Sequence, residues 1–278
     1  MAIEKPSPID VFLRFKNAEY PELVSKTNPY VTKKGSPESY FLRYIISFQN
    51  RIWVINHIVT NINYWMDKAL EEYSRVQTNG SSSFNANNIL TFYFETLADV
   101  IFKIMETIAN INLMLFNPKK NGSRKFLKQT SLITNGQLSF SSSYDHTVKK
   151  YSGFFSTVGR IRHNSTHFLT GMTVYSKGPS GEASPEYLNY ELRESPNEVI
   201  DTNQELIYGY RQIIPEIISE TSNWLNDVCS SYLELLDRKK KYSITVLYPD
   251  RIEIQQTSID DFVDGIPGEV VNTVNIHR

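Results

Sequence analysis

The chain has 278 residues, with 29 basic and 30 acidic side chains and a hydrophobic content of 40%, an ordinary composition for a globular protein with a substantial core. Its one cysteine, Cys229, excludes an intrachain disulfide and any metal site built from several thiolates. The N-terminus lacks the apolar run of a signal peptide, and no segment has the length and apolarity of a membrane span, so we expect a cytoplasmic protein.

Charge is distributed unevenly along the chain. Residues 1–106 carry 11 side chains of each sign. Residues 107–181 carry ten basic side chains and a single acid, Asp145, which gives a net charge of +9, whereas residues 182–278 carry 8 basic and 18 acidic side chains. Such asymmetry indicates a surface that binds a polyanion.

Two long amphipathic helices are predicted after an irregular, proline-punctuated arm over residues 1–35. The first begins at Ser36-Pro37 and ends before the polar run 78–83, and the second runs from about Asn88 to Asn117-Pro118. The short connection predicts an antiparallel pair. The expected buried stripes are Phe41, Ile45, Phe48, Ile52, Ile55, Val59, Ile62, Met66, Ala69 and Tyr73 in the first helix, and Leu90, Phe94, Leu97, Ile101, Ile104, Ile108, Ile111 and Leu115 in the second.

A basic segment follows the second helix. It contains five cations and no acid: Lys119, Lys120, Arg124, Lys125 and Lys128. This pattern is typical of a solvated loop with a short helix, and equally of a rim that contacts phosphates. Both interpretations stay open on the sequence alone.

A third long helix is predicted after the serine-rich linker 139–143, with Val148, Tyr151, Phe155 and Val158 in register. Continuing that register places Arg162 at the next inward position. An apolar stripe that turns into arginine is a local inconsistency of the kind found at functional sites.

The rest of the chain mixes helical and strand patterns. Residues 172–200 are predicted as an insertion with short strands at 172–175 and 187–192, and a long helix follows from about Asn203 to the basic run 238–241. Alternating apolar residues from Ile244 to Ile254 predict a hairpin, followed by an acidic tail. We therefore expect an all-α bundle over residues 36–240 with a small β insertion, followed by a C-terminal β-hairpin and tail over residues 241–278.

The densest group of titratable side chains is Arg160-Ile-Arg-His-Asn-Ser-Thr-His167. His163 and His167 have the four-residue spacing of zinc-binding HExxH helices, but Asn164 stands where that motif has its glutamate. A hydrogen-bonded polar patch without chemistry is a second interpretation. A metal-free ribonuclease site is a third, because histidine suits proton transfer near neutral pH and arginine suits phosphate oxygens.

Arg162-His163-Asn164-Ser165-Thr166-His167 resembles the R-x(4–6)-H motif of the HEPN superfamily, helical-bundle proteins that include many ribonucleases of toxin–antitoxin, abortive-infection and CRISPR systems. The resemblance implies that Arg162 binds phosphate, that His167 is catalytic and that His163 is a supporting polar residue. Arg160 satisfies the longer motif spacing and is an alternative principal arginine. The family's composite site implies a homodimer, and its biology implies a possible antitoxin partner.

We therefore expect a metal-independent endoribonuclease that acts without a cofactor and leaves a 2′,3′-cyclic phosphate. RNA would be guided by the segment from Lys119 to Lys128. The alternatives are a HEPN-like protein that binds RNA or a nucleotide without cleaving it, and a structural bundle that acts through its helix faces. Glu95 and Asp99, four residues apart on the second helix, either face the Arg160–His167 cluster or are salt-bridged surface acids.

Overall fold

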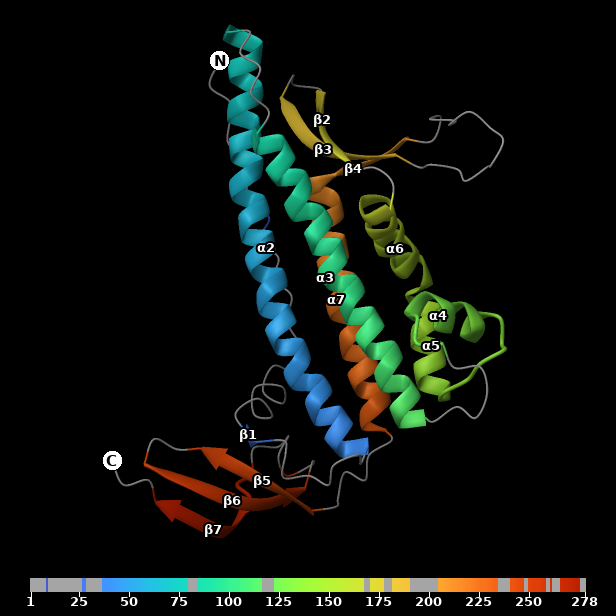
Figure 1. Cartoon of the computed structure of the whole chain (residues 1–278), viewed down its shortest axis with the longest axis vertical. Helices are drawn as coiled ribbons and strands as arrows, with labels where there is room; N and C mark the ends of the chain where they lie inside the picture. Colours follow the sequence, from blue (N-terminus) through green and yellow to red (C-terminus); the bar gives the residue numbers. More distant parts are fainter. Residues whose placement is uncertain are drawn as a thin grey trace. The chain divides into compact units, whose positions relative to one another are not determined.

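A computed structural model describes residue 9 and residues 27–28, 37–79, 85–116, 123–167, 171–177, 182–190, 205–234, 241–247, 250–258, 261 and 266–275 (Figure 1). The helices of this part are α2 (Pro37–Asn79), α3 (Asn85–Phe116), α4 (Phe126–Thr134), α5 (Ser142–Lys150), α6 (Ser152–His167) and α7 (Tyr210–Leu233). Its strands are β1 (Thr27–Asn28), β2 (Met172–Lys177), β3 (Ala183–Tyr190), β4 (Glu205–Gly209), β5 (Lys241–Leu247), β6 (Arg251–Ser258) and β7 (Glu269–Asn275).

The expectation of an all-α protein is wrong. The strands form two antiparallel sheets, one in the order β1-β5-β6-β7 and the other in the order β2-β3-β4, so the fold mixes helices with sheets. Long bundle-like helices are nevertheless present, and α2 and α3 run antiparallel as their short connection predicts (Figure 1). The sequence predicts the wrong fold class because β1 has only two residues and because β4 and β7 lie where a helix and a tail are predicted.

The chain divides into two compact units. The first comprises residues 1–13, 54–103 and 152–221, and the second comprises residues 14–53, 104–151 and 222–278. Helices α2, α3 and α7 contribute residues to both units.

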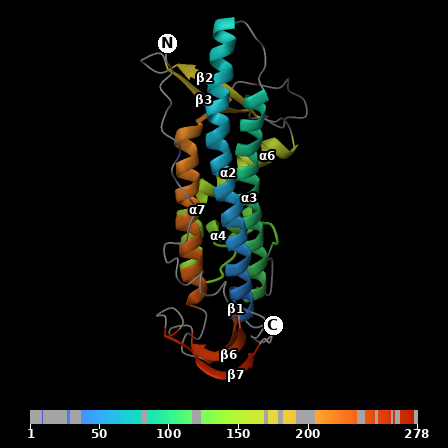
Figure 2. The same cartoon turned by 90° about the vertical axis from the view of Figure 1, so that its left-hand side faces the viewer.

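In the first unit, parts of α2, α3 and α7 pack with α6 and the three-stranded sheet (Figure 2). The predicted apolar stripes of this unit face the core apart from Tyr73, which is only half-buried. Each of these predicted side chains is at most 2% exposed: Ile55, Val59, Ile62, Met66, Ala69, Leu90, Phe94, Leu97, Ile101, Phe155 and Val158. Burying one such aliphatic or aromatic side chain contributes about 1.5–3 kcal/mol. The regular spacing of these buried side chains fixes which face of each helix is turned toward the core.

The three-stranded sheet is attached to the helices by hydroxyl groups. The Tyr175 hydroxyl donates to the Ala69 carbonyl of α2 at 2.8 Å, and the hydroxyl oxygens of Thr173 and Thr91 lie 3.0 Å apart. Both tyrosine and threonine come from β2, while Ala69 and Thr91 come from different helices. The face of β2 that carries Thr173 and Tyr175 is therefore the one turned toward the bundle.

Strand β4 replaces the start of a predicted helix. The sequence predicts a helix from about Asn203, but residues 205–209 pair with β3, Leu206 lying opposite Asn189, and α7 begins only at Tyr210. Pro185, which precedes the predicted strand 187–192, lies within β3 opposite Tyr175. Pro185 precedes the residues of β3 that pair with β4, which are 186–190, so β4 requires no hydrogen bond from this position.

The second unit contains α4, α5 and the four-stranded sheet, together with parts of α2, α3 and α7. The expected hairpin is present as β5 and β6, with Leu247 opposite Ile252. The sheet extends beyond it on both sides, because Thr27–Asn28 pair with β5 and residues 269–275 pair with β6. The predicted third helix is divided at Tyr151 into α5 and α6.

Candidate functional site

The Arg160–His167 cluster occupies the C-terminal end of α6. Phe155, Val158 and Ile161 are buried and fix this helix against its neighbours. Gly159 lies within α6. Arg160 and Arg162 are half-buried, whereas His163 is exposed. His167 is the last residue of α6, and its side chain lies outside the described part of the chain.

Arg162 is positioned by helix α3. Its guanidinium carbon lies 4.8 Å from the centre of the Phe102 ring, a cation–π contact. Its Nε atom lies 3.8 Å from Oδ1 of Asp99, whose Oδ2 accepts from Lys103 at 2.6 Å. The Asp99 carboxylate thus faces Lys103 of its own helix, α3, and Arg162 of α6. Asp99 is a salt-bridged acid that also faces the cluster, so the two interpretations of this residue are both correct.

Glu95, one turn before Asp99 on α3, holds the chain just beyond the cluster. Its Oε1 atom accepts from the Gly171 backbone N–H at 2.8 Å and from the Tyr187 hydroxyl at 2.9 Å. Burial raises the pKa of the Glu95 carboxyl, and these two hydrogen bonds oppose that rise. Burial likewise raises the pKa of the Tyr187 hydroxyl, with the nearby Glu95 carboxylate adding to the effect.

Gly171 permits this arrangement because it has no side chain. A Cβ atom at this position would lie 2.3 Å from ring atoms of Tyr187, closer than real carbon contacts allow. Glu95, Gly171 and Tyr187 therefore form a fixed point four residues after the end of α6.

The predicted phosphate-contacting segment and the motif belong to different compact units of the chain. Arg124, Lys125 and Lys128 are exposed around the start of α4, in the second unit, whereas the Arg160–His167 cluster belongs to the first. Lys119 and Lys120 lie outside the described residues. The start of α4 is anchored by Glu106, whose Oε1 atom accepts from the Phe126 N–H at 3.0 Å, a favourable position for a carboxylate at a helix N-terminus.

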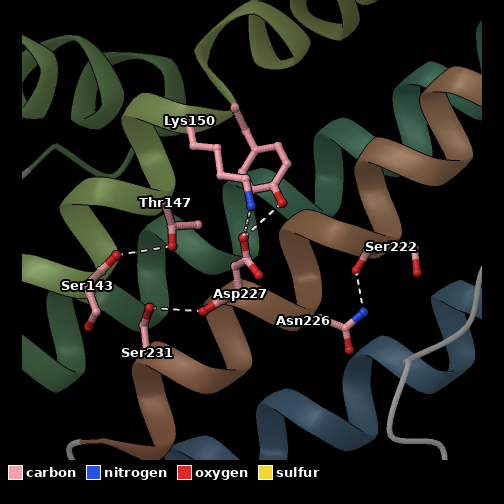
Figure 3. A network of polar contacts seen from close by, with 8 residues as sticks. Ser143, Thr147, Lys150, Ser222, Asn226, Asp227 and Ser231 are labelled. Carbon is pink, nitrogen blue, oxygen red and sulfur yellow. Dashed lines mark hydrogen bonds and ion pairs between the residues drawn. The ribbon is translucent and has the colours of Figure 1, made fainter.

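Other basic residues of the second unit have acidic partners. Lys150 of α5 lies 2.8 Å from the carboxylate of Asp227 on α7, and the Tyr151 hydroxyl donates to the same oxygen at 2.8 Å (Figure 3). Ser143 of α5 donates at 2.6 Å to Glu234, the residue that follows the end of α7. These contacts stabilise the packing of α5 and the residues next to it against the C-terminal part of α7.

Sequence reasoning missed Phe102, Lys103 and Tyr187 as neighbours of the cluster. Lys103 has only the four-residue spacing from Asp99 as a local indication. Phe102 and Tyr187 are aromatic residues in apolar segments and carry no pattern that distinguishes them from core. Their contacts with Arg162 and Glu95 join distant segments, so only the fold reveals them.

Within the described residues, no three histidine, cysteine, aspartate or glutamate side chains gather in a way that could hold a metal ion. None of the helices in that part of the chain combines the length and apolarity needed to cross a membrane. No family model, curated protein or solved structure matches this chain.

Proposed function

We propose that this chain is a metal-independent endoribonuclease whose site lies at the C-terminal end of α6. The observation that carries the proposal is the placement of Arg162, which is held on the Phe102 ring and against Asp99, next to the exposed His163. In this proposal Arg162 binds the phosphate, and His163 and His167 follow it on the same helix. The resemblance of the Arg162–His167 segment to the R-x(4–6)-H motif of HEPN ribonucleases supports the same conclusion.

The proposed reaction uses the nucleophile that RNA already carries. A histidine accepts the proton of the 2′-hydroxyl as its oxygen attacks phosphorus, and the bond from phosphorus to the 5′-oxygen breaks. A second group protonates the departing 5′-oxygen, which leaves a 2′,3′-cyclic phosphate and a 5′-hydroxyl. Arg162 stabilises the negative charge that accumulates on the phosphorane oxygens. His167 is assigned one proton transfer by the resemblance, with His163 and Arg160 in supporting roles.

The second proton-transfer group belongs, in this proposal, to another copy of the chain. A homodimer that joins two motifs supplies the acid and the base from two copies of His167. Arg124, Lys125 and Lys128 guide the RNA backbone by charge. A cytoplasmic location, which suits a chain with a single cysteine, and an antitoxin partner complete the proposal.

The test is incubation of the purified chain with single-stranded RNA in excess EDTA, with the product ends analysed. We expect cleavage that leaves 2′,3′-cyclic phosphates and that is lost in Arg162→Ala and in His167→Ala, by about 100-fold or more for each. His57→Ala and Arg75→Ala are matched controls, because both residues are exposed on α2 in the same unit. RNA binding without cleavage under any condition would support the non-catalytic alternative instead.

A further inference from the structure

Lys103 is the cation that the structure adds to the candidate site. It lies on α3, outside the basic third of the sequence, with its side chain 61% exposed. Its Nζ atom binds Oδ2 of Asp99 at 2.6 Å, while Oδ1 of the same carboxylate lies 3.8 Å from Nε of Arg162. Because both cations face one carboxylate, a single phosphodiester group, or two successive ones, can span them.

Two cations and one carboxylate come together at the candidate site. Asp99 provides one negative charge against the positive charges of Lys103 and Arg162, and Arg160 lies two residues before Arg162 on α6. The Nε atom of Arg162 is buried, and Oδ1 of Asp99 lies 3.8 Å away, beyond hydrogen-bonding distance, so this pair contributes little stability. A phosphate oxygen can therefore compete with Asp99 for Arg162 at small cost.

Asp99 and Phe102 constrain the direction of Arg162. The guanidinium carbon of Arg162 lies over the Phe102 ring, and Oδ1 of Asp99 lies on the side of the Nε atom. The other N–H groups of a guanidinium are on its two terminal nitrogens, which are the groups that form paired hydrogen bonds with phosphate. A guanidinium oriented in advance loses less entropy when it binds a phosphate.

We propose that Lys103 is a second phosphate-binding residue of the site and that Asp99 is the positioning residue that holds Lys103 and Arg162 beside each other. This assignment rests on the proposed endoribonuclease function, which it extends from one arginine to a pair of cations on two helices. It predicts that the RNA backbone runs past the surface where α3 meets α6 within the first unit.

The test measures RNA binding and cleavage separately in the full-length chain. Binding uses a short fluorescent single-stranded 2′-O-methyl RNA, which lacks the attacking hydroxyl, over a series of salt concentrations. We expect Lys103→Gln to weaken binding severalfold and to reduce the slope of log affinity against log salt by about 0.7, the contribution of one phosphate contact on a single strand. Lys68→Gln is the matched control, since Lys68 forms a similar exposed pair with Glu71 on α2 at 2.9 Å.

Asp99→Asn separates positioning from binding. Removing its negative charge should leave RNA affinity equal or higher, whereas kcat for cleavage of unmodified RNA should fall about tenfold because Arg162 is less well oriented. Thermal unfolding of each variant shows that the fold is intact. A salt slope for Lys103→Gln equal to that of Lys68→Gln would overturn the role of Lys103, and an unchanged kcat in Asp99→Asn would overturn the role of Asp99.

The failure of this inference is distinguishable from failure of the proposed function. If the wild-type chain binds the RNA probe but cleaves no RNA, the endoribonuclease proposal and the role of Asp99 fall, and the salt slope still decides the role of Lys103. If the wild-type chain binds no RNA, both proposals fall. If it binds and cleaves while both variants behave like Lys68→Gln, only the further inference falls.

Discussion

The Glu95 carboxyl is partly buried, which disfavours its charged form, so the free energy of unfolding depends on pH. Because its pKa is raised in the folded chain, the ionised carboxyl costs stability at a pH above the folded pKa. The cost disappears as the pH falls through the folded pKa toward the unfolded value of about 4.3. Glu95→Gln keeps an oxygen for Gly171 and Tyr187 without the charge. We therefore expect it to be more stable than the wild type at pH 8, with the difference shrinking toward pH 4.

Urea unfolding of the two chains at several pH values measures this difference. The matched control is Glu216→Gln, a substitution at an exposed position of α7 in the same unit. If the difference between wild type and Glu95→Gln were the same at every pH, or if it grew as the pH fell, the charge of Glu95 would not be the cause.

At the scale of elements, four helices of the second unit meet at one buried amide. Asn112 of α3 donates to the Tyr144 hydroxyl of α5 at 2.6 Å and to Oε1 of Gln129 of α4 at 3.2 Å, and it accepts from the Tyr232 hydroxyl of α7. All four side chains are at most 1% exposed. Such a network specifies one arrangement of these helices, because each buried partner that loses its hydrogen bond costs about 1–3 kcal/mol.

Asn112→Ala should therefore be strongly destabilising, by several kcal/mol in urea unfolding, since three buried groups lose a partner at once. Asn110→Ala, at an exposed position of the same helix, is the control and should change stability little. A double-mutant cycle with Tyr232→Phe measures the coupling directly. Additive effects in this cycle would contradict the idea that the hydrogen bonds act as one network.

The sequence predicts an element correctly where buried side chains repeat along it. It fails where an element forms by pairing with a segment that is distant in the sequence. The stripes through Phe94 and Val158 were predicted because helical periodicity is local. β4 was not, because Leu206 fits a helical stripe as well as a strand, and its partner β3 lies across a long connection. In the candidate site, the sequence singles out Arg162 because an apolar stripe breaks there, whereas Phe102 and Lys103 lie on another helix and only the fold brings them near it.

At the scale of the whole molecule, the blocks of charge along the sequence do not correspond to the two compact units. The basic third contributes Arg124, Lys125 and Lys128 to the second unit and Arg160 and Arg162 to the first. Some of its charge is compensated by the acidic third, as in the pair of Lys150 with Asp227. A local surface, and not the net charge of a segment, is therefore the quantity that determines where a polyanion binds.

The oligomeric state tests the proposed reaction at this same scale. One chain offers a single matched pair of Arg162 and His167, while the reaction needs both an acid and a base, so a site made from two motifs predicts an active homodimer. If wild-type chains are mixed and exchanged with His167→Ala chains, mixed dimers have one histidine and should be inactive. RNA cleavage should then fall with the square of the wild-type fraction, whereas mixing with His57→Ala chains should leave it unchanged. A linear decline with His167→Ala, or full activity from a chain that sediments as a monomer, would show that each chain carries a complete site.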